Sequence, residues 1–326
     1  MTSVVIWLNK ERDQKVLWGV ADTRITNSSS DGSASRILDT YPKIFELPIK
    51  VSADLARVRY SRIHSYGIAF AGSTLLASAT KEIVTFLCSN LSLNTPLNFD
   101  EPINLLKALT FSIQETNEFN ESLRNQLPAL SEFVETIKNV LNQVVESYIK
   151  NQPYSDFKNL EFCIFGYCLQ LKKFCAYTLT CIMFEDKDEE DKPFKNYSIN
   201  ITSKIFDENS ENLEFILLGD RKELISSLIE EKKQELESSR VYQYWRTPCY
   251  VMEDIIDEDY LLTIGSSAQL LKVNDRDALS VGISTKNTQM NYYGFKLLKF
   301  EGEEFTMQGF RNYGFTPNTL ELGFKE

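Results

Sequence analysis

Histidine is almost absent from this sequence. The one histidine, His64, excludes every catalytic or metal-binding arrangement that needs two, and we expect it to be a loop or hydrogen-bonded residue. The six cysteines form no Cys-x-x-Cys pair. Cys163 and Cys168 would face opposite sides of one continuous strand, so they could not share a metal ion. We therefore expect buried, reduced thiols, no zinc site and no cofactor.

Positive charge and long apolar runs are also scarce. Against 46 Asp and Glu there are only 35 Lys and Arg, which gives a net charge of -11. Phosphate backbones and anionic membranes bind clustered Lys and Arg, so neither nucleic acid nor a membrane is an expected partner. No apolar run approaches the roughly 20 residues that span a bilayer. Since a signal-peptide pattern is also missing, we expect a cytoplasmic protein. The Gly-x-x-x-x-Gly-Lys-Ser/Thr phosphate loop is absent, so any ATP-driven step would belong to another chain.

What the sequence does contain is enough apolar residues, 43%, to bury a large core. The runs 3–9 and 16–22 predict a hairpin of two strands, and both are apolar almost throughout, as in strands covered on both faces. Further strands are expected at 41–49, 66–73, 162–171, 174–184, 198–206 and 213–218, with a terminal hairpin of 292–300 and 305–310. Helical spacing is found at 74–91, 103–113 and 127–148, and a charged helix is expected at 221–239. Solvated loops are expected at 27–35 and 185–191.

The order of these elements predicts the fold class. Strands, helices, strands, a helix and strands follow one another without a βαβ rhythm, an internal repeat or a proline-rich linker. This order favours stacked antiparallel sheets covered by helices, an α+β fold.

Three polar residues stand out near the first strands: Thr2, Asp22 where the second strand ends, and Lys43 where the third begins. Removal of Met1 would give Thr2 a hydroxyl and a free α-amine, a nucleophile with its own base. That amine titrates near ~8, and a nearby ammonium such as Lys43 would shift more of it to the basic form. Asp22 would pair with Lys43 and keep it charged. Each of these three residues has an ordinary structural explanation when taken alone. Only their combination predicts an active site.

The backbone N–H groups at Gly72 and Ser73 are the expected oxyanion site. A strand ends there and a helix begins, with Ser73 or Thr74 as N-cap, so the N–H groups would point at a developing negative charge. Thr2 would attack a carbonyl, and its amine would act as general base directly or through a water.

Four segments together resemble a known family: Thr2-Ser-Val-Val, Gly19-Val-Ala-Asp-Thr-Arg-Ile-Thr26, Lys43-Ile and Gly67-Ile-Ala-Phe-Ala-Gly-Ser-Thr74. They look like the proteasome β-subunit branch of the N-terminal-nucleophile (Ntn) hydrolases, including its bacterial proteasome-like peptidases. The resemblance covers residues 1–90 well and the remainder only by element order. It implies a four-layer αββα sandwich, with Thr2 as nucleophile and base, Asp22 and Lys43 tuning it, and Gly72 marking the oxyanion hole. It also implies that Thr26 hydrogen-bonds an extended peptide by strand addition. Ser73 is the second residue expected to bind substrate.

The match to this family has two open points. The family's Gly-Ser-Gly motif, whose serine supports the amine of the nucleophile, has two candidates. Ile264-Gly-Ser-Ser267 matches the chemistry and favours Ser266, whereas Leu218-Gly-Asp220 matches the order of elements. The chain is also longer than a typical subunit. We expect one enlarged domain, 1–326, with insertions near 90–160 and 185–260 that cap the site, alter assembly or replace an unfoldase partner.

The favoured function is a threonine peptidase or amidase that acts on peptide or protein substrates. A homo-oligomer is expected because the resembled family works in rings, and an unfoldase partner is possible. A non-catalytic subunit with a structural or binding role is one alternative, and an acylase for small amides is another. The prediction depends on Met1, because a retained Met1 would convert the Thr2 amine into an amide and remove the base.

Overall fold

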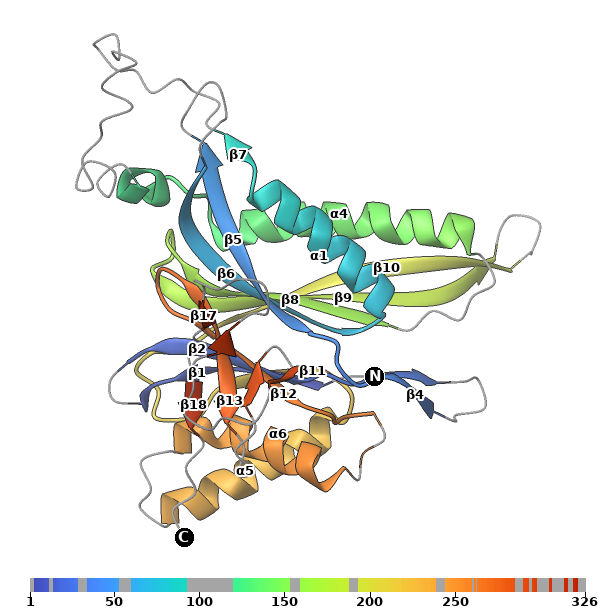
Figure 1. Cartoon of the computed structure of the whole chain (residues 1–326). Helices are drawn as coiled ribbons and strands as arrows, with labels where there is room; N and C mark the ends of the chain where they lie inside the picture. The colour runs from blue at the N-terminus through green and yellow to red at the C-terminus, as the bar shows by residue number, and fades with distance from the viewer. Residues whose placement is uncertain are drawn as a thin grey trace, which may run out of the picture.

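The computed structural model of the chain describes residues 3–11, 14–28, 34–52, 60–92, 120–152, 159–187, 193–238, 244–259, 261, 263–284, 290–292, 295–297, 305–306, 314–315 and 319–321. Within these residues the chain is an α+β protein of mostly antiparallel sheets and a few helices, and the predicted fold class is confirmed at that level. Figure 1 shows two large sheets, each with helices on one side.

The first sheet is centred on the two N-terminal strands. β1 (Ser3–Asn9) and β2 (Val16–Asp22) form the predicted hairpin, with Trp7 opposite Trp18. The hairpin lies inside the sheet, which explains its apolar sequence, and the strand order is β11-β1-β2-β12-β13-β14-β15 with β18 beside β13. The other strands are β11 (Phe215–Gly219), β12 (Ala268–Val273), β13 (Ala278–Ser284), β14 (Met290–Tyr292), β15 (Phe295–Leu297) and β18 (Thr319–Glu321).

The second sheet has six strands in the order β10-β9-β8-β6-β5-β7. Its members are β5 (Ile44–Ser52), β6 (Ser61–Gly72), β7 (Leu91–Ser92), β8 (Leu160–Cys168), β9 (Lys173–Lys187) and β10 (Pro193–Ile205). Neighbouring strands are antiparallel except for β5 and β7.

Helices cover the outer face of each sheet. α1 (Thr74–Cys88) and α4 (Leu130–Asn151) pack on each other and on the second sheet, whereas α5 (Lys222–Ser238) and α6 (Thr247–Glu258) pack on the first (Figure 1). A short 3-10 helix, η2 (Tyr244–Arg246), leads into α6. The described part contains no helix with both the length and the apolarity needed to cross a membrane.

Three apolar cores follow from this layering. One lies between the two sheets and includes Ile6, Ile44 and Phe165, while the others lie between each sheet and its helices. Cys163 belongs to the core between the sheets and Cys168 to the core under α1 and α4, so the two face opposite sides of β8, as predicted. All six cysteines are free and buried, which confirms that prediction.

The sequence interpretation is wrong at several boundaries. The expected loop 27–35 is flanked by two paired strands, β3 (Ile25–Ser28) and β4 (Ala34–Leu38), which take up both of its ends. The strand expected at 198–206 is the longer β10, which pairs with β9 from Pro193 to Ile205. β9 therefore continues into the acidic run that we interpret as a loop, because strand pairing outweighs the low β-propensity of its charged residues.

Two further differences concern the C-terminal third. α6 is not predicted from the sequence, and most of its residues are buried in the structure, including the polar Thr247 and Glu253. In place of the expected hairpin of 292–300 and 305–310, β14 pairs with β15, and β16 (Phe305–Thr306) pairs with β17 (Gly314–Phe315). The helix expected at 103–113 lies outside the described residues.

Candidate active site

A buried ion pair stands where β2 ends and β5 begins. The Nζ atom of Lys43 lies 3.0 Å from Oδ2 of Asp22, and the side chains are 2% and 0% exposed. Lys43 Nζ also donates to the carbonyl oxygen of Arg24 at 2.5 Å. The sequence prediction that Asp22 and Lys43 come together is thus met by the geometry.

Burial of the two charged side chains costs free energy, because both lose contact with water. Because the ammonium loses its water, burial lowers the pKa of Lys43 below its usual value, and the neighbouring Asp22 carboxylate counteracts this. A buried pair persists only when its remaining hydrogen-bonding capacity is satisfied. A buried ion pair such as Asp22 and Lys43 is often no more stabilising than apolar residues would be, so its presence suggests a role other than stability.

Asp22 receives backbone N–H groups from three different segments. Its Oδ1 accepts from Ser3 at 3.0 Å, and its Oδ2 accepts from Arg24 at 3.1 Å and from Gly265 at 3.4 Å. Ser3 is the residue after Thr2, so the bonded nitrogen belongs to the peptide bond that joins them. Thr2 itself lies outside the described residues. The carboxylate therefore fixes the start of β1 and the loop before β12 at the same point.

The other side of Ser3 is held by the turn between β11 and α5. Ser3 pairs with Gly219, and its hydroxyl donates to the carbonyl oxygen of Asp220 at 2.8 Å. Asp220 is one of the two candidates for the family's Gly-Ser-Gly position, and its backbone is the part that meets Ser3. Ser266, the other candidate, is half-buried in the loop before β12 with a φ of 75°.

Ser267 is a residue that the sequence interpretation missed. Its side chain is 1% exposed, and within the described part of the chain its hydroxyl has no hydrogen-bond partner. It directly precedes Ala268, which pairs with Asp22. A buried hydroxyl that leaves its hydrogen bond unmade is costly, so its position beside Asp22 points to a use. The Gly-Ser-Ser segment was the available signal, and the choice of Ser266 within it stays a prediction.

Gln269 was also missed, although it joins the two sheets beside Lys43. Its Oε1 accepts the backbone N–H groups of Lys43 at 2.8 Å and Ile44 at 3.1 Å, and its Nε2 donates to the Ile44 carbonyl. The side chain is 3% exposed. An amide in the apolar run of β12 was the signal that could have revealed it.

Arg24 links the loop before β12 to the rest of the site. Its guanidinium donates to the carbonyls of Leu261 and Ile264 at 3.2 and 3.1 Å and pairs with Asp259 at 2.7 Å. Gly265 packs against the same group, and a Cβ atom there would lie 2.4 Å from it. The loop that brings the Gly265 N–H to Asp22 is thus held by a buried arginine.

Gly72 and Ser73 lie where β6 ends and α1 begins, just after the part of β6 that contacts Lys43. Phe70, two positions earlier, donates its N–H to the Lys43 carbonyl at 3.1 Å. Gly72 ends β6 with a φ of 99°, and a Cβ atom would lie 1.8 Å from the Asn159 carbonyl oxygen, so only glycine fits. Ser73 is the N-cap of α1 but makes no side-chain cap bond. The oxyanion role predicted for the backbone N–H groups of Gly72 and Ser73 stays a prediction.

Thr26, the predicted peptide-binding residue, belongs to the small sheet. It pairs with Arg36 of β4 and is 5% exposed. One edge of β3 is therefore already occupied by β4, and an extended peptide would have to add to the other edge.

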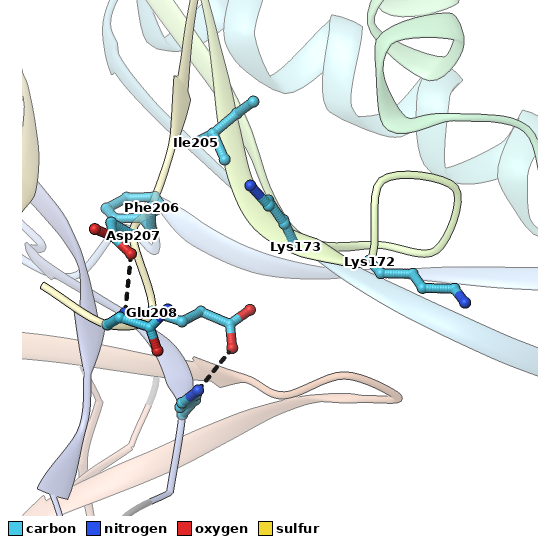
Figure 2. Close-up of a pocket in the computed structure, with 8 residues that line it drawn as sticks. Lys172, Lys173, Ile205, Phe206, Asp207 and Glu208 are labelled. Atoms are coloured by element: carbon cyan, nitrogen blue, oxygen red, sulfur yellow. Dashed lines mark hydrogen bonds and ion pairs between the residues drawn. The ribbon is translucent and has the colours of Figure 1, made fainter.

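A separate cavity of about 550 Å³ lies at the opposite end of β2 (Figure 2). Lys15 and Glu208 on its wall form an ion pair at 3.0 Å. A strand rises roughly 3.3 Å per residue, so roughly 20 Å separates Lys15 from Asp22. The cavity is lined by Lys15, Lys172, Lys173, Ile205, Phe206, Asp207, Glu208 and Asn209. It does not belong to the site around Asp22.

Among the residues that the structure describes, no cluster of His, Cys, Asp or Glu is suited to a metal ion.

The chain was compared with family models, curated proteins and solved structures. No family model matches the chain, and no curated protein does. Among solved structures, a helical assembly of the Anbu complex from Pseudomonas aeruginosa is 10% identical with a TM-score of 0.43, over 92% of this chain and 88% of that one. A mutant of Anbu from Hyphomicrobium sp. strain MC1 is 12% identical with a TM-score of 0.37, over 84% and 82%. Another structure of Anbu from that strain is 12% identical with a TM-score of 0.34, over 83% and 82%.

These comparisons correct the family assignment made from sequence. The three solved structures named above are Anbu proteins, and no family model supports the proteasome β-subunits or their bacterial peptidase branch, so that assignment is wrong. The segments behind it are short strands and one strand-to-helix turn, which are common to many folds.

Proposed function

We propose that the chain is an amide hydrolase whose nucleophile is Thr2 after removal of Met1. One observation carries the proposal: Asp22 holds the Lys43 ammonium at 3.0 Å and the Ser3 N–H at 3.0 Å, one residue from Thr2. The Asp22 carboxylate thereby binds both a buried positive charge and Ser3, the residue that follows Thr2. The role of that positive charge would be to favour the unprotonated form of the Thr2 amine.

The proposed reaction has two halves. The Thr2 hydroxyl transfers its proton to the α-amine as its oxygen bonds to the substrate carbonyl carbon. The C–N bond then breaks, the leaving amine takes that proton, and an ester remains on Thr2. A water, deprotonated by the free α-amine, cleaves the ester and restores the hydroxyl. The N–H groups at Gly72 and Ser73 would hold the oxyanion, and the Ser267 hydroxyl would hold the amine.

The remaining expectations belong to the same proposal. The two facing sheets with outer helices support a four-layer αββα arrangement of the Ntn-hydrolase type in one enlarged domain. Peptides or proteins as substrates, a homo-oligomer, an unfoldase partner and a cytoplasmic location remain predictions.

The test combines intact mass with activity. We expect the purified chain to lack the mass of Met1, and a peptide epoxyketone, which reacts with both the amine and the hydroxyl of an N-terminal threonine, to add its full mass to Thr2. Thr2→Ala should abolish amide hydrolysis, and Thr2→Ser should retain part of it. Both variants keep a small second residue, so removal of Met1 is unaffected.

Three outcomes separate the alternatives. Unreduced hydrolysis by Thr2→Ala would overturn the proposal. Retained Met1 together with no labelling would favour a non-catalytic role. Turnover of short acyl amides but not of peptides would narrow the function to an acylase.

A further inference from the structure

Glu161 reaches from the second sheet to the first at the end where Ser3 lies. It belongs to β8, where it pairs with Ala71, and its neighbour Leu160 pairs with Gly72. Its Oε2 accepts the backbone N–H of Gly219 at 2.6 Å, and its Oε1 accepts from Lys222 Nζ at 2.5 Å. The site described so far does not use this carboxylate.

The contact with Gly219 bears on the start of β1. Gly219 pairs with Ser3 and has a φ of 88°, and the next residue, Asp220, offers the carbonyl that accepts the Ser3 hydroxyl. A hydrogen bond from an N–H to a carboxylate is charge-assisted and short, so it fixes the amide more firmly than a neutral acceptor would. Glu161 therefore sets where the Asp220 carbonyl lies.

Ser3 is consequently held from two sides. Asp22 binds its nitrogen, and the turn at Gly219 and Asp220, itself held by Glu161, binds its hydroxyl. The orientation of Ser3 determines the direction in which the chain leaves β1 toward Thr2.

We propose that Glu161 is a positioning residue that aligns Thr2 with Asp22 and Lys43 by fixing the turn between β11 and α5. The role rests on the proposed function. Glu161 touches neither member of the ion pair in the described contacts, and it acts through the backbone of Gly219 and Asp220. Lys222, the first residue of α5, holds the other carboxylate oxygen and keeps the side chain extended toward Gly219.

The matched variants are Glu161→Ala, Glu161→Gln and Lys222→Met. We expect Glu161→Ala to lower kcat about tenfold with KM nearly unchanged, because a misplaced nucleophile slows the chemical step more than binding. Glu161→Gln keeps an oxygen that can accept from Gly219, so it should restore most of kcat. The kcat of Lys222→Met should lie between those of Glu161→Ala and Glu161→Gln. Hydrogen exchange at the Gly219 amide should be faster in Glu161→Ala than in Glu161→Gln.

A control separates positioning from general stability. Glu214 pairs with Lys204 at 3.6 Å near the other end of β11, so Glu214→Ala removes a similar Glu–Lys pair away from Ser3. We expect it to leave kcat unchanged. A kcat for Glu161→Ala equal to that of the wild type, or equal losses in the Ala and Gln variants, would overturn the role of Glu161 alone. If the wild type shows no Thr2-dependent turnover, the proposed function fails, and this role fails with it.

Discussion

The Asp22 carboxylate and the Lys43 ammonium are in contact at 3.0 Å in a place that almost no water reaches. The pair joins the end of β2 to the start of β5, and through Asp22 it also holds Ser3. The pair therefore contributes both to the stability of the fold and to the proposed reaction, and these contributions can be measured separately as the free energy of unfolding and as kcat.

Lys43→Met should destabilise the protein by about 3–5 kcal/mol, because it leaves the Asp22 charge buried without its partner. Denaturant unfolding measures this change. The double variant Lys43→Met/Asp22→Asn should be more stable than Lys43→Met alone, since the unpaired Asp22 carboxylate has been removed. Lys15→Met, which removes a partly exposed pair with Glu208, is the control and should cost under about 1 kcal/mol. Equal losses for Lys43→Met and Lys15→Met would contradict the prediction.

Gly72→Ala should lower the thermal midpoint markedly. The added Cβ would overlap the Asn159 carbonyl oxygen at 1.8 Å, and the φ of 99° is unfavourable for alanine, so the end of β6 must move. A loss of roughly 1–3 kcal/mol is expected. Ser73→Ala is the neighbouring control. Because Ser73 makes no side-chain cap bond, its removal should change the midpoint little.

Ser267→Ala should raise stability while lowering activity. The buried hydroxyl has no partner among the described residues, so its replacement removes a desolvation cost and adds up to about 1 kcal/mol. If the hydroxyl holds the Thr2 amine, kcat should fall at the same time. A variant that is more stable and fully active would show that Ser267 takes no part in the reaction.

His64 should make the protein less stable in mild acid. Burial, followed by the nearby Arg124, lowers the pKa of His64 to about 4, whereas in the unfolded chain it is near 6.5. Between these values the unfolded state binds the extra proton, so stability falls as the pH drops from about 6.5 toward 4, by at most about 1.4 kcal/mol per pH unit. Thermal midpoints of the wild type and His64→Gln across that range measure the effect. Gln can still bond the Tyr167 carbonyl, which His64 Nε2 contacts at 3.2 Å. If the thermal midpoints of the wild type and His64→Gln changed with pH in the same way, His64 would not be the cause of the loss of stability in acid.

The cysteines should be unreactive in the native protein. Burial raises the pKa of Cys88, Cys163 and Cys175 to about 12 and that of Cys181 to about 11, so little thiolate forms at pH 8. A thiol reagent should label the native chain slowly and all six thiols after denaturation. Rapid labelling of the folded protein would indicate an opening that the structure does not contain.

The sequence predicted the centre of the molecule better than its periphery. The continuous apolar runs of β1 and β2 predict strands covered on both faces, and burial of that kind depends on local composition alone. The start of α1 could also be predicted from the sequence, because Ser73 and Thr74 follow a glycine that ends a strand. The family resemblance did not hold, since short strand motifs carry little information about kinship.

The rest depended on contacts between distant segments. Gln269 and Ser267 acquire their roles only once β12 lies beside β2, and nothing in their local sequence reveals that pairing. α6 was not predicted, and most of its residues are buried in the structure. Arg24 looks like an ordinary surface residue until Asp259 and the loop before β12 surround it.

The position of β1 between β2 and β11 has a consequence for synthesis. β2 leaves the ribosome soon after β1, but Asp220, which accepts the Ser3 hydroxyl, follows 217 residues later. At roughly 5–20 residues per second, translation of that stretch takes about 10–40 s. During this interval β1 has no strand to pair with on its β11 side. The first sheet is therefore completed along that edge only after about two thirds of the chain has been made.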